Sequence, residues 1–301
     1  MRNELPVISR VQLIDEIKHA IEKKTGFAMG KIGFSEQFFL GYLPFLKTSP
    51  SGLKIKAYEL SLKHHCEIQS GVFPINPEFL KEFASFYTSC LQSIDILGIF
   101  GADQEKELIE NNNIKANLIS YQLTEPDRSI PSKDEECYLQ YFSNKKLLYI
   151  SPFAELLKER SNKEVYESVW KNIQKKWFYP ESVQAIEIPY SYGNSKSTHE
   201  MYGTSLNLYH RICAELDKYE FDIVLLGVGA LGLPLSSYIK SKGKVAISLG
   251  GHLQVLFGVN GSRWKRDDFW KKHYINEEWI EMPREYHPDN KDQLTDVGAY
   301  W

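Results

Sequence analysis

Apolar residues recur at every third or fourth position in several stretches of the chain, which is the spacing of one helical face. The first such helix begins after Ser9, because Ser9 and Gln12 have the spacing of a capping box, and Gly26 is predicted to end it. Asn76-Pro77 marks the start of another helix, since proline suits the first helical position. Residues 35–43 are predicted to form the start of a further helix. Two more helices are predicted over 201–219 and 231–242. The apolar faces of the first two are Leu13, Ile14, Ile17, Ala20, Ile21 and Phe79, Leu80, Phe83, Phe86, Tyr87, Cys90.

Short apolar runs alternate with these helices and predict β-strands. This alternation predicts an α/β fold, in which a parallel sheet is flanked by helices on both faces. We expect a single domain over residues 1–301, with a long polar loop or hinge at 124–137. The predicted strands lie within residues 27–33, 96–100, 146–153, 184–189, 221–226 and 244–249.

Composition narrows the class of protein. Lys and Arg total 36 and Asp and Glu total 39, so the net charge of −3 argues against a dedicated nucleic-acid-binding protein. The four cysteines lack metal-ligand spacing and are expected to be reduced thiols. No signal peptide, integral membrane segment or basic amphipathic helix is predicted. We therefore expect a cytoplasmic protein, with peripheral contact at the inner membrane face left open.

A glycine motif, "GVGALG", follows the predicted strand 221–226 and has the spacing of a dinucleotide-binding loop. Gly227 permits a tight turn, Gly229 lets the backbone approach a ligand, and Gly232 lets the helix pack closely on the sheet. An NAD enzyme also needs an acidic residue about 20 positions later, and the next strand ends in "SLGG" instead. The first arginine that follows, Arg263, is distant. Helix packing without a cofactor therefore remains the main alternative for these glycines.

A second glycine cluster lies in "GKVAISLGGHLQVLFGVNGSRW", residues 243–264. Strand ends bind ligands in open α/β sheets, and glycine pairs there can present N–H groups to phosphate. Arginine can form charge-assisted bonds with a diphosphate, and tryptophan offers a stacking plane. For the histidine, a buried structural position is an equal alternative. The cluster supplies the candidates Gly250, Gly251, His252, Gln254, Arg263 and Trp264.

The run from "DIVLLGVGALG" to "GVNGSRW" resembles the C-terminal half of the bacterial GT-D-type glycosyltransferase family, as do "LLYISPFAELLKER", "YINEEW" and the final "GAYW". The resemblance covers roughly residues 145–301 and is weak before them. It implies a Rossmann-like fold and transfer of a sugar from a nucleotide-sugar donor, a UDP-sugar above all. The acceptor would be a glycan, a lipid-linked molecule or a glycoprotein in bacterial surface polysaccharide or glycoprotein synthesis.

The resemblance also implies a metal-binding Asp-x-Glu near the N-terminus. Its counterpart here is "KIGFSE", residues 31–36, in which Glu36 matches the glutamate, Phe34 occupies the aspartate position and Lys31 replaces an arginine. Loss of one carboxylate weakens Mn²⁺ or Mg²⁺ binding, because hard cations need several oxygen ligands. Three possibilities follow: a metal held by Glu36 and the donor diphosphate, a metal-independent enzyme, or altered activity.

The expected roles follow from the chemistry of glycosyl transfer, which requires charge on the leaving diphosphate and a base for the acceptor hydroxyl. Glu36 is the candidate base or metal ligand, although a helix-start carboxylate is its simpler interpretation. Lys31 and Arg263 are candidates for phosphate charge. Ser151 would cap a helix beginning at Pro152 and present N–H groups, or act as a plain cap. Other expected donor-binding residues are Gly33, Ser35, Gly227, Gly229, Gly250, Gly251, His252, Gln254 and Trp264.

Two other functions remain open. A non-catalytic nucleotide-sugar-binding or scaffolding subunit is supported by Phe34 at the aspartate position. An NAD(P)-dependent oxidoreductase fits the "GVGALG" spacing but not the missing acid.

Overall fold

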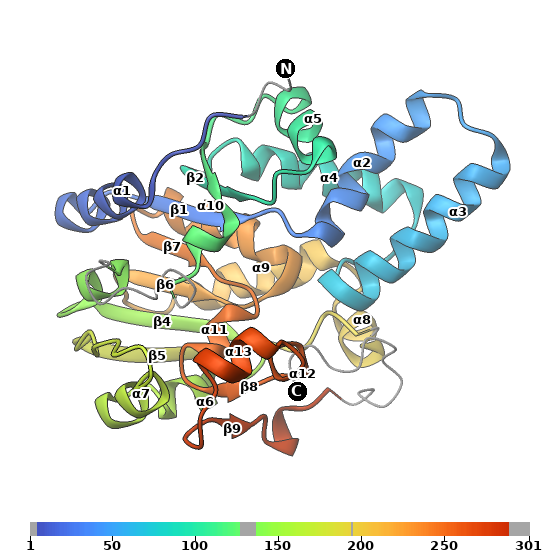
Figure 1. Ribbon diagram of the computed structural model, residues 1–301. Coiled ribbons are helices and arrows are strands. Elements are labelled where there is room, and N and C mark those ends of the chain that lie inside the picture. The colour runs from blue at the N-terminus through green and yellow to red at the C-terminus, as the bar shows by residue number, and fades with distance from the viewer. Residues whose placement is uncertain (1–4, 127–136, 194, 289–301) are drawn as a thin grey trace.

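The structure, a computed structural model, describes residues 5–126, 137–193 and 195–288. A seven-stranded sheet in the order β3-β2-β1-β7-β6-β4-β5 forms its centre, and every neighbouring pair is parallel (Figure 1). The predicted parallel sheet is thus confirmed. Its strands are β1 (Phe27–Lys31), β2 (Ile96–Ile99), β3 (Asn117–Ser120), β4 (Lys146–Ser151), β5 (Ser182–Glu187), β6 (Ile223–Leu226) and β7 (Val245–Ser248). A separate parallel pair joins β8 (Val259–Asn260) to β9 (Ile280–Glu281).

Helices cover both faces of the sheet, as predicted. Side chains alternate between the faces along each strand, so Phe27 and Met29 of β1 enter one hydrophobic cluster and Ala28 enters the other. The helices are α1 (Arg10–Lys23), α2 (Phe34–Lys47), α3 (Gly52–Leu62), α4 (Pro77–Leu91), α5 (Asp103–Asn111), α6 (Ala154–Glu159), α7 (Lys163–Val169), α8 (Lys196–Tyr202), α9 (Ser205–Leu216), α10 (Gly232–Ser241), α11 (His252–Val255), α12 (Ser262–Lys265) and α13 (Asp268–His273).

Short helical turns of other types connect these elements. A π-helical segment, η1 (Lys63–Ser70), continues from α3. The 3₁₀ turns are η2 (Tyr121–Thr124), η3 (Tyr138–Phe142), η4 (Gly229–Leu231) and η5 (Arg284–Tyr286). In the described residues no helix is both long and apolar enough to span a bilayer.

The first helix shows how local sequence determines a boundary. Gln12 N–H donates to Ser9 Oγ at 3.3 Å and Ser9 N–H donates to Gln12 Oε1 at 2.9 Å, which confirms the capping box. The prediction that Gly26 ends α1 is wrong, because the helix ends at Lys23 and Lys24 takes the left-handed conformation at φ +54°. Gly26 instead allows close packing, since a Cβ there would overlap the Lys240 carbonyl.

The single helix predicted over 201–219 is also wrong. Gly203 has φ +69° and separates α8 from α9, and Thr204 then caps α9 by accepting from Asn207 N–H at 3.1 Å. Glycine tolerates this conformation at little cost, so the apolar stripe of α9 starts only after it. The elements α3, η1 and α11 to α13 had no counterpart in the sequence prediction.

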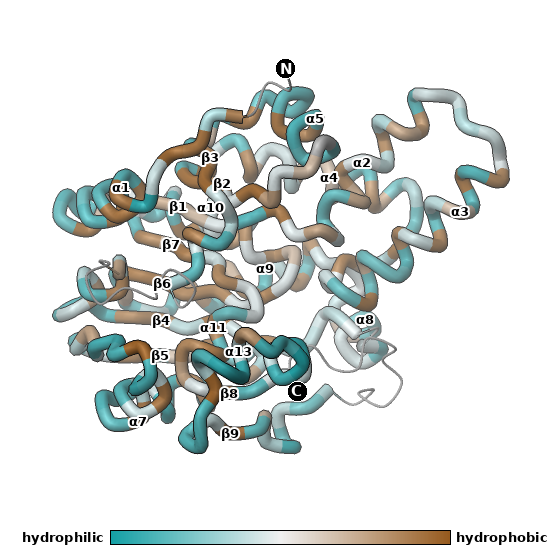
Figure 2. Tube along the Cα trace, viewed as in Figure 1, coloured by the Kyte–Doolittle hydropathy of each residue, from teal (hydrophilic) through white to brown (hydrophobic). Residues whose placement is uncertain are grey.

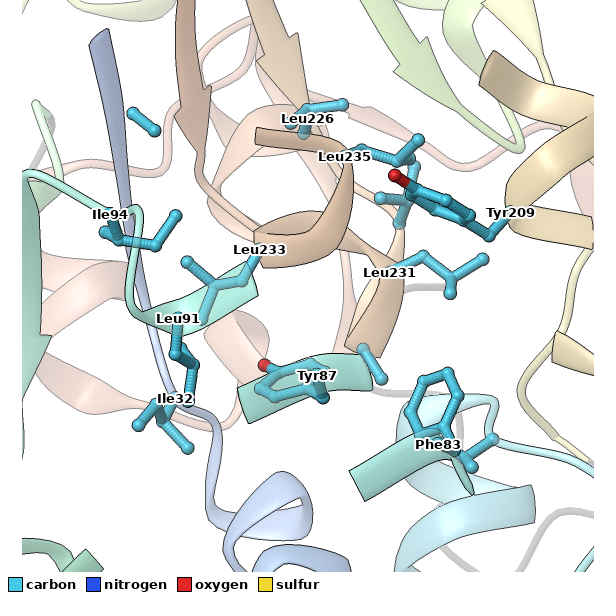
Figure 3. Packing of buried hydrophobic residues seen from close by; sticks show 14 of the residues in the cluster. Ile32, Phe83, Tyr87, Leu91, Ile94, Tyr209, Leu226, Leu231, Leu233 and Leu235 are labelled. Carbon is cyan, nitrogen blue, oxygen red and sulfur yellow. The ribbon is translucent and has the colours of Figure 1, made fainter. Parts of the chain in front are cut away.

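One of the two hydrophobic clusters surrounds α10. Leu233 lies beside Leu91 and Tyr87 of α4, whereas Leu235 lies toward Tyr209 of α9 (Figure 3), and all five side chains are buried. Burying a leucine of this kind contributes about 2 kcal/mol. The packing holds α4 and α10 against β1 and β7, the strands whose carboxyl ends carry the candidate site.

The domain prediction is left open by these observations. Strands from both halves of the chain enter the one sheet, since β7 lies between β1 and β6. The predicted loop or hinge at 124–137 falls mostly at 127–136, which lies outside the described residues. A single domain over 1–301 therefore stays a prediction.

Candidate functional site

Because the sheet is parallel, its seven strands end at one edge, which we call the carboxyl edge. Ligands bind at this edge in open α/β sheets. Lys31 is the last residue of β1 and is in register with Gly98 of β2. A Cβ at Gly98 would lie 3.0 Å from a Thr124 methyl carbon, so the missing side chain lets η2 pack against Lys31. The sequence therefore places a cation at the centre of the edge, beside the loop that follows η2.

Glu125 links Lys31 to His252. The Lys31 ammonium donates to Glu125 Oε1 in an ion pair, and His252 Nδ1 lies 3.0 Å from the same oxygen. The Glu125 side chain is 1% exposed and that of His252 is 6% exposed. Lys31 ends β1, Glu125 lies after β3 and His252 lies after β7, so the network joins three segments at the carboxyl edge. Sequence analysis missed Glu125, which stands alone before Pro126 in a polar stretch.

Glu36 is a buried carboxyl group in the first turn of α2. It is 8% exposed, and burial raises its pKa from the ordinary value of 4.5 to about 7. A hydrogen bond from its own backbone N–H and the positive charge of Lys31 lower this pKa in part. A group with a pKa near neutral pH is suited to exchange a proton during catalysis.

Gly33 caps α2 and determines where the Glu36 carboxylate lies. A Cβ at Gly33 would overlap Glu36 Oε2, so the carboxylate occupies the space that glycine leaves at the helix start. Gly33 has φ −65°, so an alanine fits the backbone and only the position of the carboxylate requires glycine. Gly33 thus acts by positioning Glu36.

Two neutral groups lie close enough to Glu36 to respond to its charge. Burial and the nearby Glu36 charge raise the pKa of the Cys66 thiol, which stays protonated at neutral pH. Burial and the same charge also raise the pKa of Tyr87. Lys31 is therefore the cation that acts on Glu36 in the described structure.

Ser35 belongs to a polar network with η1. Its Oγ donates to Gln69 Oε1 at 2.7 Å, His65 Nδ1 lies 2.8 Å from that oxygen, and Gln69 Nε2 lies 3.1 Å from His64 Nε2. Phe34 is 61% exposed and meets the His65 ring edge-on at 5.6 Å. π-Helical segments often occur at functional sites. The sequence signal for this network was the pair His64-His65 followed by Gln69, and sequence analysis did not use it.

The "GVGALG" glycines are explained by packing within the chain. Gly229 has φ +56°, and a Cβ there would lie 2.6 Å from the Ser70 carbonyl oxygen of η1. A Cβ at Gly227 would lie 3.1 Å from the Gly250 carbonyl oxygen, and one at Gly232 would overlap Ser248 Oγ. The motif thus has a structural basis that needs no dinucleotide.

The second glycine cluster contains an open position. Gly250 has φ +56°, and a Cβ there would meet nothing within 4 Å. Gly251 precedes the short helix α11, which begins with His252. Gln254 is fully buried, and its Nε2 donates to the carbonyls of Val259 and Asn260 at 3.2 Å each. A ligand can therefore approach the backbone closely at Gly250. Gln254 has a structural role instead, because its side-chain amide stabilises the chain at Val259 and Asn260.

Of the neighbouring residues Arg263 and Trp264, the arginine lies at the surface and the tryptophan lies in the core. Trp264 is 1% exposed and packs edge-on to His252 at 5.7 Å, so the expected stacking plane lies within the protein. Arg263 is exposed, with its guanidinium carbon 5.9 Å from the Trp264 ring centre. Arg263 is therefore the member of this pair that can meet a ligand in solution.

Ser151 ends β4 at the carboxyl edge and is fully buried. Its Oγ accepts from Phe153 N–H at 3.2 Å, while Phe153 is the N-cap of α6. The predicted helix start at Pro152 is therefore wrong by two residues. Ser151 stabilises the turn before α6, which is the simpler of its two predicted roles.

The described residues do not fit the expected Mn²⁺ or Mg²⁺. Among them no group of three or more His, Cys, Asp or Glu side chains is placed to hold a metal ion. Glu36 faces the charge of Lys31 and the protonated Cys66, and Phe34 stands at the position of the second expected carboxylate. Hard cations need several oxygen ligands. No catalytic step is therefore assigned to a metal.

Comparison with known proteins adds two solved structures; no family model and no curated protein matches the chain. One structure is described as "The highly conserved domain of unknown function 1792 has a distinct glycosyltransferase fold". It is 14% identical, with 94% of this chain and 93% of that chain covered and a TM-score of 0.49. The other, a selenomethionine-substituted structure of the same domain of unknown function, is 13% identical, with coverage of 92% and 97% and a TM-score of 0.41. The first description names the kind of fold that the sequence resemblance implies. With TM-scores below 0.5 the likeness carries no argument about function, which rests on the site.

Proposed function

We propose that the protein is a glycosyltransferase that moves a sugar from a nucleotide-sugar donor to an acceptor hydroxyl, with Glu36 as the base. The observation that carries the proposal is the position of Glu36: a nearly buried carboxyl at the carboxyl edge, with its pKa raised to about 7. An ordinary helix-start carboxylate is exposed and keeps a low pKa. Burial of the Glu36 carboxyl disfavours its charged form, and such perturbed pKa values are typical of catalytic acids and bases.

The reaction uses Glu36 as a proton acceptor. The acceptor hydroxyl oxygen forms a bond to the anomeric carbon of the sugar while the bond from that carbon to the diphosphate breaks. The hydroxyl proton passes to the ionised Glu36 carboxylate, and the nucleoside diphosphate leaves with the electron pair. Close to its pKa, about half of Glu36 is ionised at neutral pH, so it can accept this proton and later release it.

Charge on the leaving diphosphate is balanced by the protein in this proposal. Arg263 is exposed and can form a bidentate pair with a phosphate. Gly251 can present its N–H group, because nothing would crowd a ligand at the neighbouring Gly250, whose own N–H donates to the Leu226 carbonyl at 3.1 Å. Lys31 contributes less free charge than expected, because Glu125 already pairs with it. We propose a UDP-sugar as donor and a glycan, lipid-linked or glycoprotein acceptor of surface polysaccharide assembly.

Donor binding is tested by thermal unfolding with UDP-, GDP-, CMP- and dTDP-sugars, with and without Mn²⁺. A ligand at 100 times its dissociation constant stabilises the folded state by about 2.7 kcal/mol, which raises the melting temperature by several degrees. Glu36→Gln should bind the same donor with unchanged affinity and transfer no sugar. Absence of stabilisation by every nucleotide sugar, or full turnover by Glu36→Gln, would refute the proposal.

A non-catalytic nucleotide-sugar-binding subunit is the second candidate. It is favoured by Phe34 at the position of the expected aspartate and by the lack of a metal-ligand set in the described residues. The two functions differ in one measurement. Donor binding without donor hydrolysis or transfer, across glycan, lipid-linked and glycoprotein acceptors, would establish the binding subunit.

A further inference from the structure

Helices α2 and α3 form an arm that extends away from the sheet (Figure 1), joined by residues 48–51. Its two helices are held together on their inner sides. The Tyr58 ring stacks on Phe45 with centroids 4.5 Å apart, and Tyr58 Oη donates to the Phe38 carbonyl at 2.9 Å. The inner face of α3 is thus satisfied by α2, and its outer face meets solvent.

The outer face of α3 carries two unusually exposed leucines. Leu53 is 82% exposed and Leu60 is 72% exposed, the highest values among the exposed large hydrophobic residues of the described structure. Their spacing of seven residues is two helical turns, so both project from the same side. Figure 2 shows the resulting mixture of hydrophilic and hydrophobic positions along α3. Both side chains are therefore open to contact from outside the chain.

The outer part of this arm, from the last turn of α2 to the first residue of η1, carries a local positive charge. Residues 44–63 contain four lysines and one glutamate, a net charge of +3 in a chain whose total is −3. The four lysines are exposed, and within the described structure none of them forms an ion pair. They are Lys47, Lys54, Lys56 and Lys63.

A groove borders the inner end of this face. It has a volume of about 840 Å³ and is lined by Lys56 and Leu60 of α3, Lys63 of η1, Lys196 of α8 and Pro77 at the start of α4. Two glutamates, at positions 59 and 67, also line it, so its positive excess is smaller than that of the arm. The groove places lysines next to apolar surface. The lysines complement the phosphate of a phospholipid head group, and the apolar surface complements the first methylenes of its acyl chains.

We propose that the arm docks on a lipid bilayer that contains anionic phospholipids. Leu53 and Leu60 enter the boundary between head groups and acyl chains, and the lysines contact lipid phosphates with their methylene stems against the apolar layer. Charge favours this occupant over a second copy of the chain, because two copies of residues 44–63 would each bring a net charge of +3 to the interface. The sequence analysis predicted no basic amphipathic helix. It missed α3 because its lysines and leucines are interspersed rather than on opposite faces.

Binding of the full chain is measured by co-sedimentation with vesicles of phosphatidylcholine alone or with about 30% phosphatidylglycerol, at about 0.1 M salt. We expect binding only to the anionic vesicles. The variant with Lys47→Glu, Lys54→Glu and Lys56→Glu should bind more than about 100-fold more weakly, since each lysine near an anionic bilayer contributes about fivefold. No substrate is present, so the result does not depend on the proposed glycosyltransferase function.

A matched control separates docking from net charge. Lys23→Glu, Lys115→Glu and Lys272→Glu change the net charge equally at exposed positions outside the arm and should alter binding by less than about fivefold. Equal losses in the two triple variants, or absence of binding by the wild type, would overturn the proposal. Circular dichroism of each variant confirms that the fold is intact.

The leucines are tested separately. Leu53→Ser with Leu60→Ser should weaken binding to anionic vesicles by roughly 100-fold, whereas Val11→Ser, at another exposed apolar position, should leave it unchanged. Light scattering supplies the test of the rival occupant. A wild-type dimer that the leucine substitutions dissociate, with vesicle binding unaffected, would assign this face to self-association and overturn docking on lipid.

Discussion

Replacing Glu36 by glutamine should make the protein more stable at alkaline pH while removing turnover. In the unfolded chain the Glu36 carboxyl ionises near pH 4.5, and in the folded protein its pKa is about 7. Because the folded pKa is raised, the folded state binds the proton more tightly, and stability falls as the pH rises from 4.5 to 7. Glutamine has nearly the same shape and carries no charge, so this loss disappears in the variant.

The size of the effect follows from the two pKa values. The difference between 4.5 and about 7 corresponds to roughly 3 kcal/mol, at about 1.4 kcal/mol per unit of pKa. Glu36 is only 8% exposed, so solvent screens the charge of its carboxylate little. We expect Glu36→Gln to exceed the wild type by about 3 kcal/mol at pH 8 and by less than about 1 kcal/mol at pH 5.

The assay is thermal unfolding of both proteins at pH 5 and pH 8. For a chain of this length, 3 kcal/mol corresponds to an increase of roughly 5 °C in melting temperature at pH 8. Glu107→Gln, at an exposed position of α5, serves as the control and should shift the melting temperature equally at both pH values. If the stability difference between Glu36→Gln and the wild type is the same at pH 5 and pH 8, the reasoning is refuted. The raised pKa would then no longer support the catalytic role.

Three further substitutions test the site. Gly33→Ala should lower turnover by roughly 100-fold with the melting temperature nearly unchanged, because its Cβ displaces only the Glu36 carboxylate; a large drop in melting temperature with normal turnover would contradict this. Lys31→Met should cost about 3 kcal/mol by leaving the Glu125 charge without its lysine, and adding Glu125→Gln should recover part of that stability. Thermal unfolding in which the double variant recovers nothing would show that the pair is not the cause. Gly229→Ala should cost more than about 2 kcal/mol, because φ is +56° and the Cβ meets a backbone carbonyl of η1; denaturant unfolding at wild-type midpoint would contradict it.

Much of the fold was predictable because its signals are local. The capping box at Ser9 and the Asn76-Pro77 helix start depend on residues three or four positions apart, and both are confirmed. The break at Gly203 was missed because the apolar stripe of α9 hid it, although the glycine was visible in the sequence. The arm helix α3 was missed because neither of its faces is consistently polar.

The candidate site was predicted less completely. The segment 31–36 and the second glycine cluster do lie at the carboxyl edge, as parallel strands require. Sequence analysis could not identify Glu125 or the His64-His65-Gln69 network, since each acquires its meaning from a neighbour distant in the chain. It also expected Trp264 at a ligand, and only packing of the C-terminal helices shows that the ring is buried.

The sequence by itself determined the alternation of strands and helices, the helix starts at Ser9 and Asn76-Pro77 and the parallel sheet, because backbone preference and hydrophobic periodicity act over a few residues. Strand order was decided only by the tertiary structure, which places β7 beside β1 and so brings Lys31, Glu125 and His252 together. The raised pKa of Glu36 is likewise tertiary, because desolvation depends on everything packed around a carboxyl group and not on its neighbours in the chain.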